Sequence, residues 1–213
     1  ILYDNDDYGR GLYDYFRGKA EAIGLRVVDA VAYDRDTTDF RPLLQPLMRR
    51  RPQALVLGGL YQEAALITMQ ARELGLSIPL VGSDGVFSDK YIELAGRAAE
   101  GTKVTTPFVF DEQNERAMEF SRRVRDRFGA DPDAWAVLSY DALQMIAGAI
   151  AEVGPDRDAV RRHLADIDTR EEAFDGISGP TYFDAQGDCI KPVMIGEVRD
   201  GRFAMSADQI AAE

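Results

Sequence analysis

The chain has 213 residues, 46% hydrophobic and 29% charged, a globular balance that is enough for one large domain or two small ones. The formal net charge of −12 repels phosphate backbones, so we expect no nucleic-acid partner. With one cysteine, Cys189, and one histidine, His163, the chain can form neither an internal disulfide nor a His-rich metal site.

The first half of the chain predicts strands that alternate with helices. Apolar or β-branched runs predict strands at 1–4, 25–33, 54–59, 78–85 (ending in a loop) and 102–110. Helical spacing of apolar residues predicts helices at 8–23, 40–50, 61–74 and 88–95. Thr38 or Asp39 is placed to cap the second of these helices.

The second half has a different pattern. Amphipathic or apolar stretches predict helices at 112–128, 134–153 and 158–166. Residues 174–206 contain short β-like runs separated by Gly and Asp turns. Within them "RDGR" (199–202) has the Asp-Gly pair that is typical of a β-hairpin turn.

Strands that alternate with helices indicate an α/β fold, with a parallel sheet and helices on both faces. Ligands of such sheets bind beyond the carboxyl ends of the strands. Three segments follow predicted strands in this way: "DNDDYG" (4–9), "GGLYQE" (58–63) and "GSDG" (82–85).

The Asp-rich stretch "LYDNDDYGRGLYDYF" (2–16) suggests two known kinds of site, and neither fits. An EF-hand loop that begins at Asp4 would place Tyr8 and Tyr15 where oxygen ligands are required. A dinucleotide turn would set three aspartates against a pyrophosphate, and its third glycine is replaced. Asp6 and Asp7 are better interpreted as turn and helix-start residues, with Gly9 and Gly11 allowing a close turn into the helix.

Catalytic chemistry has little support. "GSDG" lacks the spacing of a nucleophile elbow, and His163 lies in a polar helical stripe. Cys189 has no histidine nearby in the sequence, so we expect an ordinary thiol. We therefore predict no catalytic residues and no enzyme.

Three side chains remain at the predicted strand ends. Tyr8, Tyr61 and Asp84 would converge on one rim of the sheet, where two phenol rings can wall a small ligand and a carboxylate can bind its ammonium group. The alternative is purely structural: Tyr8 packs at a helix start, Tyr61 caps a helix and Asp84 forms a turn. The pattern alone leaves both open.

Five segments in order carry a family resemblance: "ILYDNDDYGRGL", "GGLYQEAALITMQARELGL", "PLVGSDGV", "AAEGTKVTTPF" and "FDGISGPTYFDAQGD". Together they resemble type I periplasmic binding proteins, in particular the branched-chain amino-acid (Leu/Ile/Val) branch of ABC-transporter substrate-binding proteins. That family has two α/β lobes that close on a ligand. The match implies that 1–130 is the second lobe and that 131–213 is a return segment, hinge and partial first lobe. We expect that the N-terminal part of the first lobe is missing.

The resemblance also implies residue roles. Tyr8 and Tyr61 match tyrosines that contact the ligand, and Asp84 matches the acidic residue that binds the α-ammonium group. Asp84 stands where Leu/Ile/Val proteins often have Glu, which puts the identity of the bound amino acid in doubt. Trp135 matches an aromatic residue that lines the pocket from the hinge side.

The implied function is the solute-binding component of an ABC importer, with an amino acid as ligand, a permease as partner, and neither cofactor nor metal. A sensory ligand-binding domain on the same fold is the alternative. The family implies a periplasmic or an extracellular, membrane-anchored location. We also expect an incomplete core in the C-terminal third, whose apolar helix face another copy of the chain could cover (Leu138, Leu143, Ile146 and Ile150).

Overall fold

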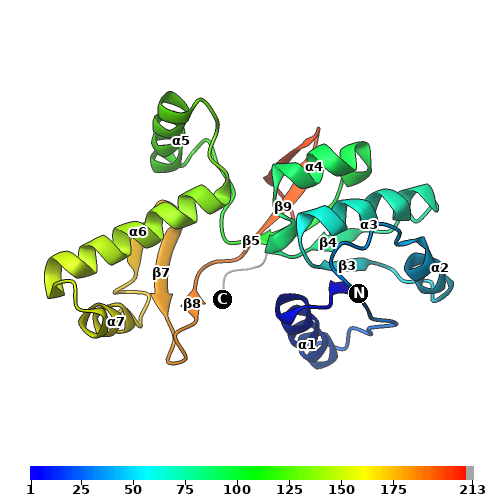
Figure 1. The fold of residues 1–213 in the computed structure, drawn as a ribbon, viewed down its shortest axis with the longest axis horizontal. Coiled ribbons are helices and arrows are strands. Elements are labelled where there is room, and N and C mark those ends of the chain that lie inside the picture. Colours follow the sequence, from blue (N-terminus) through cyan, green and yellow to red (C-terminus); the bar gives the residue numbers. More distant parts are fainter. Residues whose placement is uncertain (210–213) are drawn as a thin grey trace. The chain divides into compact units, whose positions relative to one another are not determined.

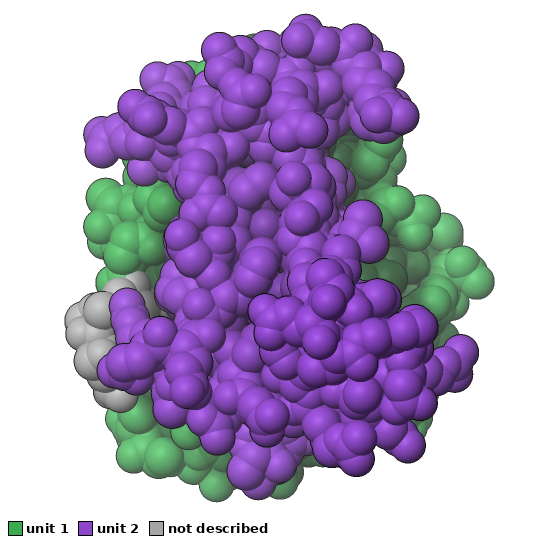
Figure 2. Space-filling model, turned by 90° about the vertical axis from the view of Figure 1, so that its left-hand side faces the viewer, with its two compact units in different colours: residues 1–106, 195–209 green, residues 107–194, 210–213 purple. Residues whose placement is uncertain are grey.

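The computed structural model describes residues 1–209, which form two compact units (Figures 1 and 2). Unit 1 contains residues 1–106 and 195–209, and unit 2 contains residues 107–194. This division differs from the expected boundary near residue 130, because the helix after residue 110 belongs to unit 2 and the last hairpin returns to unit 1. The assignment of residues to the two lobes of a binding protein stays a prediction.

Unit 1 is built on a seven-stranded sheet with the order β10-β9-β5-β4-β3-β1-β2. Its strands are β1 (Leu2–Asp4), β2 (Val31–Tyr33), β3 (Leu55–Gly58), β4 (Leu80–Gly82), β5 (Lys103–Thr106), β9 (Met194–Arg199) and β10 (Arg202–Met205). The first five strands pair in parallel, and β9 and β10 form an antiparallel hairpin. The expected α/β fold with a mainly parallel sheet is confirmed.

Helices cover both faces of this sheet, as Figure 1 shows. They are α1 (Asp7–Ala22), α2 (Arg41–Arg49), α3 (Tyr61–Glu73) and α4 (Asp89–Ala95), with 3₁₀ turns at Asp84–Val86 and Gly96–Ala99. Helix α1 contacts β1 and β3 on one face. On the other face, side chains of α2, α3 and α4 bury the core residues of the sheet, such as Leu57 and Leu80.

Unit 2 contains α5 (Glu115–Phe128), α6 (Ala134–Val153), α7 (Arg157–Ala165) and an antiparallel sheet of β6 (Phe174–Gly176), β7 (Gly179–Phe183) and β8 (Cys189–Ile190). Asp141, buried in the middle of α6, joins the helix to this sheet. Its carboxylate accepts hydrogen bonds from the backbone N–H groups of Ile177 (2.9 Å) and Ser178 (2.8 Å) and from the Ser178 hydroxyl (2.5 Å).

The main hydrophobic core lies within unit 1. Among the described residues, the cluster of buried core side chains includes none from 107–194. On α6, Leu143, Ile146 and Ile150 are exposed and Leu138 is half-buried. Helix α6 is long and apolar enough to cross a membrane. The core helices of soluble proteins can have the same length and composition. Covering of this face by another chain stays a prediction.

Most predicted elements lie within a few residues of their observed positions, but several details were wrong. The strand predicted at 102–110 ends at Thr106, so residues 107–110 are not in it. Residues 25–30 are not in a strand, since β2 pairs with β1 only from Val31 to Tyr33. Neither Thr38 nor Asp39 caps α2. The N-cap residue is Phe40, which makes no side-chain capping hydrogen bond. Helix α5 begins later than residue 112, since the Asn114 side chain caps it by accepting from the N–H of Ala117.

The predicted "RDGR" hairpin is confirmed. Asp200 and Gly201, the two residues between β9 and β10, both have positive φ angles (51° and 72°). Two consecutive left-handed residues are the signature of the tight turn that Asp-Gly favours, since its twist matches that of the flanking strands. The hairpin returns the chain from unit 2 to the edge of the unit 1 sheet.

Candidate functional site

The carboxyl ends of β1, β3 and β4 lie side by side in unit 1. The parallel register places Tyr3 beside Gly58 and Leu57 beside Gly82, so the segments that follow these strands leave from the same edge. Tyr8 lies in the first turn of α1, Tyr61 is the first residue of α3, and Asp84 begins the 3₁₀ turn after β4. This is the edge where parallel sheets bind ligands.

A hydrogen-bonded cluster joins two of the predicted residues. The Tyr8 hydroxyl lies 2.5 Å from Asp84 Oδ1 and 3.1 Å from Ser83 Oγ, and it accepts a bond from the N–H of Gly85 at 3.1 Å. Because a phenol has one proton, the short contact indicates that Tyr8 donates to the carboxylate. Residues 76 positions apart in sequence thus form one polar group at the rim.

The protonated form of Tyr8 is strongly favoured. Burial of the half-exposed ring, and next the hydrogen bond to Asp84, raise the pKa of Tyr8 to about 12. Tyr8 therefore remains a neutral donor at any physiological pH, and the negative charge of the cluster lies on Asp84.

Backbone packing fixes the position of Tyr8. Asp6 is the N-cap of α1 and accepts from the N–H of Gly9 at 2.8 Å. A Cβ atom on Gly9 would lie 2.1 Å from the carbonyl oxygen of Asp4, so only glycine allows the helix to begin this close to β1. At Gly11 a Cβ would meet nothing within 4 Å. The expected close turn therefore requires Gly9 but not Gly11.

Close packing also holds the ends of β3 and β4 together. A Cβ on Gly85 would lie 2.7 Å from the carbonyl oxygen of Gly59 and 3.0 Å from the Tyr8 hydroxyl. The Ser83 hydroxyl lies 3.4 Å from the same Gly59 carbonyl. Ser83, Gly85 and Gly59 are therefore part of the site. Sequence analysis missed them, although all three lie in the selected segments "GGLYQE" and "GSDG".

The hydrogen bonds of this cluster involve neither of the other two predicted residues, Tyr61 and Trp135. The half-buried Tyr61 ring starts α3 and packs against the hydrophobic core. Trp135 lies in unit 2, in the first turn of α6, with 45% of its surface exposed. For both residues, contact with a ligand stays a prediction.

An acidic group lies beside the cluster, at the ends of β1 and β2. Asp4 is 1% exposed, and its Oδ2 atom has no hydrogen bond. Arg35 lies 3.5 Å from that atom and 2.8 Å from Asp6. Burial, and next the charge of Asp6, raise the pKa of Asp4. Among the described residues, no three His, Cys, Asp or Glu side chains are arranged to hold a metal ion.

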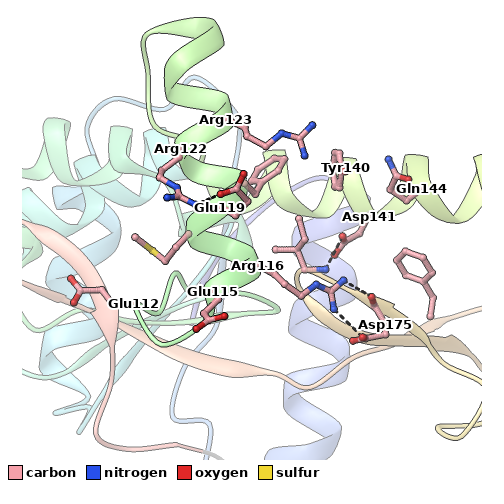
Figure 3. A pocket seen from close by; sticks show the side chains of 14 residues that line it. Glu112, Glu115, Arg116, Glu119, Arg122, Arg123, Tyr140, Asp141, Gln144 and Asp175 are labelled. Carbon is pink, nitrogen blue, oxygen red and sulfur yellow. Dashed lines mark hydrogen bonds and ion pairs between the residues drawn. The ribbon is translucent and has the colours of Figure 1, made fainter.

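A wider pocket of about 990 Å³ lies within unit 2, between α5, α6 and β6 (Figure 3). Four of its charged side chains form ion pairs with one another: Arg116 turns toward Asp175, at 2.9 Å, and Arg122 pairs with Glu119. Asp141, also in the lining, is satisfied by the β6–β7 backbone. Small-molecule sites instead combine apolar walls with a few convergent polar groups, so the rim of unit 1 is the better candidate.

Comparisons with known proteins agree with this fold. The family model described as "Periplasmic binding protein" matches residues 1–202. A Leu/Ile/Val-binding protein homolog of Brucella abortus is 29% identical over 203 residues, which are 94% of this chain and 53% of that protein. The chain spans about half the length of the curated relatives it matches.

Solved structures show the same fold. A leucine binding protein from Thermotoga maritima superposes with a TM-score of 0.86 at 30% identity, covering 97% of this chain and 58% of that one. A branched-chain amino acid transporter substrate binding protein from Streptococcus pneumoniae, in complex with isoleucine, superposes with a TM-score of 0.83 at 25% identity. The match covers 98% of this chain and 59% of that one. These are solute-binding proteins rather than enzymes. The chain therefore belongs to the periplasmic binding protein family, in its type I, branched-chain amino-acid branch.

Proposed function

We propose that the protein containing this chain binds a small amino acid, branched-chain or related, between two lobes. The single observation that supports this most is the Tyr8–Ser83–Asp84 cluster at the carboxyl edge of the sheet. It offers one fixed negative charge and hydroxyl oxygens in a half-buried setting, which suits an ammonium group. Relatives named for binding leucine, isoleucine and valine support the same ligand class.

In this proposal Asp84 pairs with the ligand α-ammonium group. Tyr8 holds the carboxylate in place by donating to Oδ1, while Gly85 holds Tyr8. Tyr61 and Trp135 provide aromatic surface for the ligand side chain. The ligand carboxylate would be bound by residues outside this chain.

The proposed role of the complete protein is that of the extracytoplasmic binding component of an ABC importer, which presents its closed form to a permease. It would be periplasmic, or extracellular and anchored to the membrane. A sensory domain that binds the same ligands is the alternative. A pull-down of the complete protein with its permease separates the two, because a sensory domain would not bind the transporter.

A thermal-shift screen of the complete protein tests the ligand class. Leucine, isoleucine, valine, alanine and phenylalanine are compared with the same compounds lacking the amino group. A ligand that binds only the folded state raises the melting temperature, and the shift grows with the logarithm of the ligand concentration relative to Kd. We expect shifts with one or more amino acids and none with the deaminated analogues. Equal shifts with both sets, or no shift with any amino acid, would refute the proposal.

A further inference from the structure

The second face of the unit 1 sheet has a gap in its packing. Strand alternation and the register place Tyr3, Val56, Gly58 and Val81 on the face that α1 covers, since their neighbours Leu2, Leu57 and Leu80 point into the core. A Cβ on Gly58 would touch the Cβ of Tyr3, on this same face. Gly58 has no side chain, so the sheet surface is hollow beside the two valines.

Helix α1 closes over this hollow without filling it. The Tyr3 ring of β1 and the Tyr13 ring of α1 stack in parallel, with centroids 4.7 Å apart. Leu12, Tyr13 and Phe16 form the roof, and Val56, Gly58 and Val81 form much of the floor. The result is a cavity of about 140 Å³.

The chemistry of the walls defines what the cavity can hold. No charged side chain lines it, and the only aliphatic hydroxyls are those of Ser83 and Thr105. Ser83 already has partners in Tyr8 and Gly59. A trapped water needs two to four polar partners, whereas apolar cavities of roughly 150 Å³ stay dry and accept benzene or xenon. Leu12, Phe16, Val56 and Val81 are only half-buried, so the cavity can be reached from solvent.

We propose that this cavity is a second binding site, for a small, uncharged, apolar molecule about the size of benzene. It adjoins the amino-acid site at Ser83 but differs from it in chemistry, since the Asp84 carboxylate does not line it. A volume of 140 Å³ accommodates a single ring and excludes a peptide segment. The proposal stands whether or not the protein binds an amino acid.

Benzene titration of the methyl-labelled complete protein, followed by NMR, tests this site. A bound ring shifts nearby methyl signals, so we expect saturable shifts confined to methyls that line the cavity, with Leu12, Val56 and Val81 as the main reporters. At the methyls of Leu12 and Val56, which every variant retains, Val81→Phe should abolish the shifts by filling the cavity, and Val81→Leu should reduce them. Val153→Phe, the same substitution at an exposed position of α6, should leave them unchanged.

Each other result overturns the proposal. The first is the absence of saturable shifts at these methyls, and the second is equal shifts in the Val81→Phe protein. If Val81→Phe loses its dispersed spectrum, the comparison of Val81→Leu with Val153→Phe decides. Shifts that follow protein concentration without benzene would show that another copy of the chain fills the cavity instead.

Discussion

At the scale of single residues, the position of Tyr8 depends on the glycine that follows it. Gly9 lies against the Asp4 carbonyl, whereas Gly11, two positions further along the same helix, has free space around its Cα. The two glycines therefore form a matched pair in which only one is needed by the site.

Gly9→Ala and Gly11→Ala should have opposite effects. Gly9→Ala forces α1 away from β1 and should destabilise the protein by about 1–3 kcal/mol, the usual cost of overpacking. Gly11→Ala should stabilise it by about 0.5–1 kcal/mol, because alanine loses less backbone entropy in a helix. Urea unfolding measures both. Similar effects from the two variants would show that the contact at Gly9 does not constrain the helix.

Asp4 should make stability depend on pH. Its folded-state pKa is raised by burial, so its favourable contribution is complete below the unfolded value of 3.8 and is lost as pH rises through the folded value. Asp4→Asn removes the buried charge and leaves Arg35 its partner Asp6. We expect this variant to be more stable than wild type at pH 8 by about 1–3 kcal/mol. The gain should shrink at pH 4, and a gain that is equal at both pH values would contradict this account.

At the scale of elements, unit 2 depends on one buried carboxylate. Asp141 satisfies two backbone N–H groups and one hydroxyl of the turn between β6 and β7, and Gly176 leaves no room for a side chain beside it. The hydrophobic core of this unit is small, so hydrogen bonds such as those of Asp141 contribute a larger share of its stability.

Asp141→Ala should loosen the β6–β7 hairpin. It leaves two buried N–H groups without acceptors, so we expect a loss of about 2–4 kcal/mol. Hydrogen exchange at the amides of Ile177 and Ser178 should accelerate most. Gln144→Ala, at an exposed position one turn further along α6, is the control. It should leave the stability and the exchange rates of these amides nearly unchanged. Unchanged exchange in Asp141→Ala would show that other contacts hold the hairpin.

The order and type of elements could be predicted from the sequence, because apolar or β-branched runs and helical spacing are local patterns. The hairpin at Asp200 and Gly201 was predicted for the same reason. The roles of Ser83 and Gly85 could not be predicted, since they depend on how closely β3 and β4 approach. The division into units also escaped prediction, because the return of β9 and β10 to the first sheet is a long-range pairing with no local signal.

At the scale of the whole molecule, this chain provides only part of the proposed pocket. It spans about half the length of the relatives it matches. Isolated residues 1–213 should therefore bind amino acids far more weakly than the complete protein does, and isothermal titration calorimetry compares the two. Micromolar binding by the isolated chain would show that the remaining residues are dispensable.

The most direct test of the central claim is a calorimetric cycle on the complete protein. The amino acid with the largest thermal shift and its deaminated analogue are each titrated into wild type and Asp84→Ala. We predict that the substitution weakens amino-acid binding by about 2–5 kcal/mol, the range for truncating one partner of a buried charge pair, and that the analogue, which lacks the ammonium group, binds neither protein measurably. Unchanged amino-acid affinity in Asp84→Ala would contradict the role assigned to this carboxylate.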